Sequence, residues 1–249
     1  MLRAGYVGAH PLEGSSGGNP LSRRRVPLYE SEPLACAFLA EGYHVFSLRY
    51  STEKGIYPAA LEQLARTVRL IRQNAGEWHV RKDAIVLAGF SAGGHLAAEY
   101  ACKWGRPALS AAAEAEREEL RPNALVLGYP VITAGAAAHE ESIHNLLGAQ
   151  DTPKMRRSVS LETQVSGCVP PVFLWHTATD EMVNAENSLL FASALAREKI
   201  PYELHIYGSG VHGVSLGTRA TVGEEKHVSH GCAGWFAQAA RFLERVLPE

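Results

Sequence analysis

Three short runs in this chain are almost wholly apolar: AIVLAG at 84–89, ALVLGYPV at 124–131 and PVFLWH at 171–176. A strand that is apolar on both sides of its pleat must be covered on both faces, as the central strands of a parallel sheet are. Two further runs, YHVFSLRY at 43–50 and YELHIY at 202–207, are rich in aromatic and β-branched residues and also predict strands. These runs constrain the chain to a layered α/β fold.

Helical patterns separate the strands. In 59–75, Leu61, Leu64, Val68 and Ile71 recur at helical spacing and form one apolar stripe. Helices are also expected over 31–40, from Ser91 onward, and over 108–121, 187–198 and 233–246, with 108–121 as a solvated surface helix. Strands that alternate with helices imply right-handed crossovers and a doubly wound, mostly parallel sheet. The long connection at 133–166 breaks the alternation and is expected to be a cap-like insertion.

The first 30 residues differ in composition from the rest of the chain. They are rich in Gly, Ser, Pro and Arg and show neither the helical nor the strand period. We therefore expect an irregular segment over 1–30, with order beginning near Ser31 and a single domain over 31–249.

The charge balance excludes several classes of partner. The 24 Lys and Arg nearly balance the 26 Asp and Glu, so nucleic acid and anionic membranes are not expected to bind. No run approaches the ~18 apolar residues of a membrane span, and the N-terminus lacks the apolar core of a signal peptide, which favours a cytoplasmic location. The four widely spaced cysteines, the absence of metal-ligand spacing and the absence of phosphate-loop motifs predict no metal and no cofactor. The oligomeric state is left open.

Gly89-Phe90-Ser91-Ala92-Gly93 matches the G-x-S-x-G nucleophile elbow. In this motif a sharp turn from strand to helix exposes the serine hydroxyl at the carboxyl edge of the sheet, and a Cβ on either flanking glycine is expected to clash. An alternative is that small residues simply pack a helix start against a strand. The buried-type strand before the motif and the apolar helix after it favour the elbow, with Ser91 as a nucleophile.

A nucleophilic serine needs a histidine as general base and a carboxylate that orients the histidine. In hydrolases of this kind the chain order is serine, acid, histidine. Asp180 lies in the loop directly after 171–176, at the sheet edge that carries the elbow. Glu181 is the competing acid, and a turn or helix-cap role is the alternative for Asp180. We favour Asp180 because a short side chain close to the strand end is more easily held rigid.

The base should follow the last strand. His212 lies between glycines and valine in the loop after 202–207, at the same edge of the sheet. Its rivals are His205, which is fixed inside the strand, and His227 and His230, which lie in a later polar loop. His95 and His176 do not have the chain order of the base, and either could support the triad through a hydrogen bond.

With these three residues the chain resembles an α/β-hydrolase, and more closely the small carbohydrate acetylesterases related to acetyl xylan esterases. The resemblance spans about residues 30–246 and is carried by ESEPLACAFLAEGYHVFSLRYS, GFSAGGHLAA, LVLGYPVIT, PPVFLWHTATDEMV and ELHIYGSGVHGVS. It implies hydrolysis of short-chain acyl esters, with acetyl groups on sugars as the expected substrates, through an acyl-enzyme. The expected partner is a small-molecule or oligosaccharide ester.

The resemblance also implies two backbone donors for the tetrahedral oxyanion. The first is the N–H of Ala92, the residue after the nucleophile. The second belongs to a glycine-rich loop after an early strand, for which Gly18 in GSSGGNPLSRRRVPLY is the candidate, although no apolar strand leads into this stretch and the N-terminal edge strands are expected to be missing. Two alternatives remain: a serine peptidase of the prolyl-oligopeptidase type, and a hydrolase-fold binding protein without a working oxyanion hole.

Overall fold

The apolar runs of the sequence form the centre of one parallel sheet in the computed structural model, which describes residues 3–11, 28–219, 221 and 231–248. The strand order is β2-β1-β3-β4-β5-β6, and every adjacent pair is parallel. The strands are β1 (Arg3–Pro11), β2 (Tyr43–Tyr50), β3 (Val86–Phe90), β4 (Ala124–Gly128), β5 (Val172–Thr177) and β6 (Tyr202–Tyr207). The doubly wound parallel sheet predicted from the sequence is confirmed.

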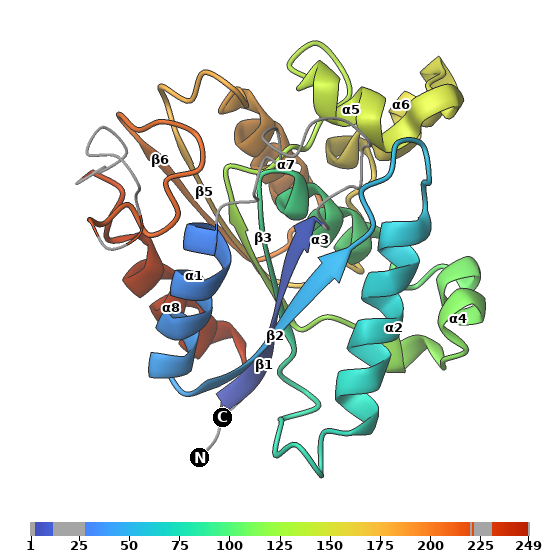
Figure 1. Cartoon of the computed structure of the whole chain (residues 1–249), viewed down its shortest axis with the longest axis vertical. Coiled ribbons are helices and arrows are strands. Elements are labelled where there is room, and N and C mark those ends of the chain that lie inside the picture. Colours follow the sequence, from blue (N-terminus) through green and yellow to red (C-terminus); the bar gives the residue numbers. More distant parts are fainter. Residues whose placement is uncertain (1–2, 12–27, 220, 222–230, 249) are drawn as a thin grey trace, which may run out of the picture.

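Helices cover both faces of the sheet (Figure 1). On one face lie α1 (Leu28–Ala40) and α8 (Trp235–Val246), and on the other α2 (Ala59–Gln73), α3 (Ala92–Lys103) and α7 (Glu186–Arg197). Successive side chains of a strand point to opposite faces, so Leu87 of β3 packs with α2 and α3 while Val86 and Ala88 pack with α1 and α8. The two resulting cores hold the carboxyl ends of the strands in fixed positions.

The prediction that residues 1–30 lack regular structure is wrong for 3–11 and 28–30. Residues 3–11 form β1, which pairs with β2 on one side and β3 on the other, and α1 already begins at Leu28. The run RAGYVGAHP has two glycines and two alanines, so its side chains give little strand signal. Backbone hydrogen bonds to two neighbouring strands stabilise it instead. A strand therefore does lead into the glycine-rich stretch, and residues 12–27 lie outside the described residues.

The single surface helix expected over 108–121 is two shorter elements. These are α4 (Pro107–Ala113) and a 3₁₀ turn, η1 (Arg117–Leu120), and Glu114 between them has a left-handed backbone with φ of 50°. Leu109 and Leu120 are buried, so both elements pack against the core rather than being surrounded by solvent.

The 133–166 segment contains α5 (Glu140–Leu147), α6 (Pro153–Val159) and the 3₁₀ turns η2 (Gly148–Gln150) and η3 (Leu161–Thr163). Its buried apolar side chains form a small cluster with Val131 and Val183, and the segment lies at the end of the sheet to which the arrowheads of β1 and β2 point (Figure 1). Gly148 contacts Gly55 in the connection from β2 to α2 so closely that a Cβ on Gly148 would lie 2.6 Å from the Gly55 Cα. The N–H of Gly55 also donates to Asn145 O at 3.0 Å. The segment is thus fixed against the connection between β2 and α2.

Within the described part of the chain, no helix is both long enough and apolar enough to cross a membrane.

Candidate active site

Ser91 lies at the sharp turn between β3 and α3. Its backbone has φ of 54° and ψ of −120°, a region that residues with a side chain rarely adopt. Three hydrogen bonds hold this conformation: Ser91 N donates to Gly128 O at 3.1 Å, and Ser91 O accepts from His95 N and Val131 N, each at 3.2 Å. The turn is therefore anchored to the end of β4 and to the first turn of α3, as an exposed nucleophile requires.

The glycines beside Ser91 are required by close backbone contacts. A Cβ on Gly89 would lie 2.1 Å from Gly93 O, which confirms the clash expected at this flank. Gly94, which the sequence did not single out, is also confined, because a Cβ there would lie 2.8 Å from Pro130 Cβ. The first turn of α3 can approach β3 and the segment after β4 only because these positions lack side chains.

Replacing Gly89 by alanine is expected to destabilise the fold by about 3 kcal/mol, because the clash is with backbone and no side chain can move aside. Gly76→Ala is the matched control, since a Cβ at Gly76 has nothing within 4 Å. Urea unfolding of both variants measures the difference. Equal stability of Gly89→Ala and Gly76→Ala would contradict the contact geometry at the elbow.

Ser91, His212 and Asp180 lie in one hydrogen-bonded row. His212 Nε2 is 2.8 Å from Ser91 Oγ, and His212 Nδ1 is 2.7 Å from Asp180 Oδ2. The three residues follow the carboxyl ends of β3, β6 and β5, respectively, so the structure brings together the residues that chain order predicted. His205 lies within β6 and contacts Glu203 instead, at 2.8 Å. His227 and His230 lie outside the described residues.

Asp180 is held as an ionised carboxylate. Its Oδ1 accepts hydrogen bonds from the N–H groups of Met182 and Val183, both at 2.9 Å, and its side chain is completely buried. His176 Nε2 lies 3.4 Å from Oδ2. Burial alone would raise the pKa of Asp180, but the hydrogen bonds from His176 and His212 outweigh it and hold the pKa well below its ordinary value. The carboxylate can therefore fix the orientation of the His212 ring at neutral pH.

The loop that carries His212 is tied to the loop that carries Asp180. Thr177 Oγ1 and Thr179 Oγ1 donate to Gly210 O at 2.9 and 3.0 Å, and Gly210 N donates back to Thr179 Oγ1 at 2.9 Å. The ring of Tyr129 packs edge-on against the His212 ring, with centroids 4.9 Å apart. These supports were not predicted from the sequence, although both threonines precede the acid in HTATD and are a signal that could have indicated them.

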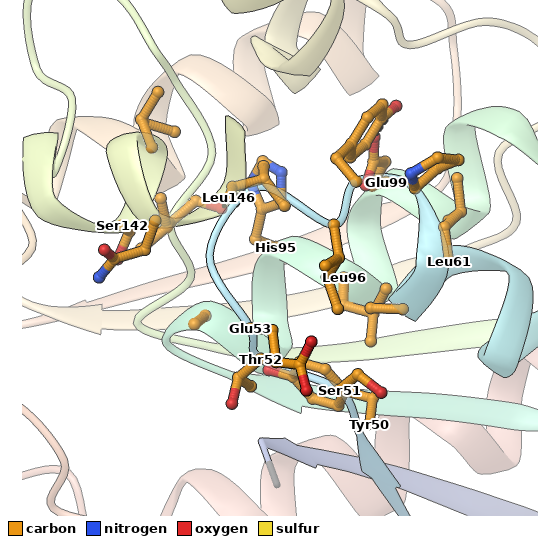
Figure 2. A pocket seen from close by; sticks show the side chains of 18 residues that line it. Tyr50, Ser51, Thr52, Glu53, Leu61, His95, Leu96, Glu99, Ser142 and Leu146 are labelled. Carbon is orange, nitrogen blue, oxygen red and sulfur yellow. Dashed lines mark hydrogen bonds between the residues drawn. The ribbon is translucent and has the colours of Figure 1, made fainter. Parts of the chain in front are cut away.

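A cavity of about 240 Å³ opens beside the nucleophile (Figure 2). Three segments form most of its wall: the first half of α3 from Ala92 to Glu99, residues 50–61 from the end of β2 onward, and residues 142–146 of α5. Val131, after β4, completes the lining. Figure 2 shows His95 and Leu96 of α3 in the middle of the view, with Ser142 and Leu146 to the left, Glu99 and Leu61 to the right, and the stretch from Tyr50 to Glu53 below. The 133–166 segment thus supplies part of the wall of a cavity next to Ser91.

A buried ion pair lies next to this cavity. Lys103 Nζ contacts Glu99 Oε1 at 2.5 Å, and each side chain is 2% exposed. Tyr57 Oη donates to the same carboxylate oxygen at 2.8 Å, and Lys103 Nζ also donates to Ser158 O at the end of α6 at 2.9 Å. The pair therefore joins α3, the connection after β2, and α6.

Of the two predicted oxyanion donors, Ala92 lies among the described residues and Gly18 does not. Ala92 is the first residue of α3 and lines the cavity, so its N–H belongs to the positive end of the helix. Gly18 lies outside the described residues. In the part of the chain that the structure describes, no group of three or more His, Cys, Asp or Glu side chains could hold a metal ion.

The sequence model of the BD-FAE family matches residues 27–195, more than half of the chain. The chain belongs to the BD-FAE family. The match includes Ser91 and Asp180 and ends before His212.

Other proteins similar to this BD-FAE chain are known. Endo-1,4-beta-xylanase B of Butyrivibrio fibrisolvens is 36% identical over 192 residues, which cover 76% of this chain and 30% of the relative. The acetylxylan esterase of Xylanibacter ruminicola is 28% identical over 183 residues, which cover 72% and 36% of the two chains. This chain thus spans about a third of the length of the curated relatives it matches.

A solved structure agrees over nearly the whole chain. The acetyl ester-xyloside bifunctional hydrolase from Caldicellulosiruptor lactoaceticus is 31% identical and superposes with a TM-score of 0.80, covering 98% of this chain and 84% of that one. This similarity confirms the α/β-hydrolase fold that the sequence resemblance implied for this BD-FAE family member.

Proposed function

We propose that this BD-FAE family member is a serine ester hydrolase that removes short acyl groups, acetyl in the first place, from carbohydrate esters. The observation that carries the proposal is the position of His212, 2.8 Å from Ser91 Oγ and 2.7 Å from Asp180. This is the arrangement of nucleophile, general base and orienting acid used in acyl transfer. The names of the similar proteins, which include an acetylxylan esterase and an acetyl ester-xyloside hydrolase, support an acetylated sugar as the substrate.

In the first half of the reaction Ser91 Oγ attacks the ester carbonyl carbon and gives its proton to His212 Nε2. The tetrahedral intermediate collapses, the bond from carbon to the alcohol oxygen breaks, and the alcohol leaves with the proton from His212. Throughout this step Asp180 holds Nδ1–H of His212 and stabilises the imidazolium. The product of this half is an acyl group on Ser91.

In the second half a water molecule attacks the acyl carbon while His212 takes one of its protons. The bond to Ser91 Oγ breaks, Oγ recovers the proton from His212, and the carboxylic acid departs. Backbone N–H groups stabilise the oxyanion in both halves. We assign this role to Ala92, at the start of α3, and to the stretch that contains Gly18. The 133–166 segment acts as a cap over the acyl-binding cavity in this scheme.

The proposal is tested by measuring nitrophenol release from 4-nitrophenyl acetate and acetate release from acetylated xylo-oligosaccharides. We expect turnover of both esters and none of a peptide 4-nitroanilide run in parallel. Turnover of the nitroanilide with little ester hydrolysis would favour a peptidase. A folded protein with neither a burst nor turnover on any ester would leave the binding protein as the better explanation.

A further inference from the structure

The cavity beside Ser91 lies on the acyl side of the proposed reaction centre. The leaving alcohol must receive its proton from His212 Nε2, so the alcohol lies towards His212 and the acyl group lies away from it. The cavity begins at Ala92, and no residue of the described part of the His212 loop lines it. In the proposed ester hydrolysis, on which this inference rests, the acyl chain therefore extends into this cavity.

The cavity is larger than an acetyl group needs. A water molecule takes up about 30 Å³ of the liquid, so a volume of about 240 Å³ holds roughly eight water-sized groups. Most of the wall is apolar, with Ile56, Leu61, Leu96 and Leu146 among its side chains. An acyl chain of several carbons fits this space and this chemistry.

One buried polar atom at the cavity wall lacks a partner. His95 lines the cavity and is only 6% exposed. Its Nδ1 lies 3.1 Å from Val131 O, whereas its Nε2 has no hydrogen-bond partner among the described residues. A buried polar group without a hydrogen bond is costly, which points to a ligand group at Nε2.

The hydrogen bond at His95 Nδ1 determines whether a ligand group at Nε2 must donate or accept a hydrogen bond. A carbonyl oxygen can only accept, so Nδ1 carries the proton. Burial lowers the pKa of His95, so the ring is neutral and Nε2 presents a lone pair. The partner must therefore be a donor. The carboxylate of Glu53 also lines the cavity and disfavours an anionic acyl group, whereas that of Glu99 is paired with Lys103.

We propose that His95 determines acyl specificity, and that its Nε2 accepts a hydrogen bond from the hydroxyl of an aliphatic hydroxyacyl ester bound in the cavity. The apolar wall contacts the carbon chain, and the hydroxyl supplies the missing hydrogen bond at His95 Nε2. The enzyme then prefers a hydroxyacyl group over an acyl group of the same shape that ends in a methyl.

The test uses pairs of methyl esters in which a hydroxyl replaces a methyl of similar size. These are 3-hydroxybutyrate with 3-methylbutyrate, and 6-hydroxyhexanoate with heptanoate, with acid release followed by pH-stat titration. For at least one pair we expect kcat/KM of the wild-type enzyme to be about tenfold higher for the hydroxy ester, the value of one net hydrogen bond.

Two substitutions separate the two nitrogens of His95. His95→Asn can still donate to Val131 O but has no atom at the Nε2 position, so we expect the ratio within each pair to fall to about one. His95→Gln places an acceptor near the Nε2 position and is expected to keep a preference for the hydroxy ester. Because each ratio compares two substrates of one variant, a general loss of activity does not change it.

Several results would overturn the inference. The inference is wrong if the wild-type enzyme hydrolyses both esters of each pair with equal kcat/KM. It is also wrong if His95→Asn keeps the wild-type preference for the hydroxy ester. Failure of the proposed function looks different, because then neither member of a pair, nor 4-nitrophenyl acetate, is hydrolysed at all.

Discussion

Replacing Ser91 by alanine is expected to lower kcat for 4-nitrophenyl acetate by about 10⁶-fold, to near the spontaneous rate. The reason is that the variant has no atom to attack the carbonyl and no group from which His212 can take a proton. The variant should fold, because the two backbone bonds to Ser91 O and the bond from Ser91 N to Gly128 do not involve the side chain. Initial rates and thermal unfolding, measured together, test both expectations.

Ser193→Ala is the matched control for this experiment. Ser193 is exposed on α7 and accepts a hydrogen bond from Arg197 on the same helix, so its loss should leave the rate unchanged. A fluorophosphonate reagent should add one group to the wild-type chain, on the peptide that contains Ser91, and none to Ser91→Ala. Substantial hydrolysis by Ser91→Ala would exclude the acyl-enzyme and require attack by water itself.

The second large effect is expected for Asp180→Asn, which should lower kcat by about 10⁴-fold. Asparagine can keep the two bonds from Met182 and Val183 with its oxygen, which turns its NH₂ group towards His212. His212 then receives a hydrogen bond at Nδ1 and carries its proton on Nε2. In that tautomer the ring cannot take the proton of Ser91.

Glu181→Gln is the control that decides between the two adjacent acids. Glu181 is exposed, and its neutralisation should leave kcat unchanged. If Glu181→Gln lowered kcat as much as Asp180→Asn does, the activity would depend on the total charge of this loop and not on the contact between Asp180 and His212.

Asp180→Asn is also expected to change how the stability of the fold depends on pH. Because the folded-state pKa of Asp180 is lowered, its carboxylate contributes stability that is fully present above the unfolded pKa of about 4 and is lost as the pH falls through the folded pKa. The difference in free energy of unfolding between wild type and Asp180→Asn should therefore be largest near neutral pH and shrink below about pH 4. Chemical denaturation over this pH range measures it.

The positions of the three proposed catalytic residues could be predicted because one rule of topology governs them. Parallel strands end at the same edge of a sheet, so residues that directly follow three predicted strands had to lie near one another. That rule also separated His212 from His205, since a residue inside β6 cannot turn towards Ser91. The preference for Asp180 over Glu181 agrees with the contact to His212.

The cavity and the N-terminal strand could not be predicted in this way. The cavity walls come from residues 50–61, 92–99 and 131–146, and no local pattern shows that these segments meet. The strand β1 gave no signal because its run RAGYVGAHP contains few residues that favour strands, although it pairs with β2 and β3. A hydrogen bond from His176 to the triad was expected as one possibility, but the sequence did not show that Asp180 is the residue it contacts.

The buried pair of Lys103 and Glu99 bears on how tolerant the 133–166 segment is to change. Removing one member of such a pair leaves an uncompensated charge and is strongly destabilising. The link from Lys103 to α6, however, ends on the main-chain oxygen of Ser158, which every amino acid provides. The segment can therefore exchange most of its side chains, and with them the contour of the cavity wall, while the charge beneath it stays neutralised.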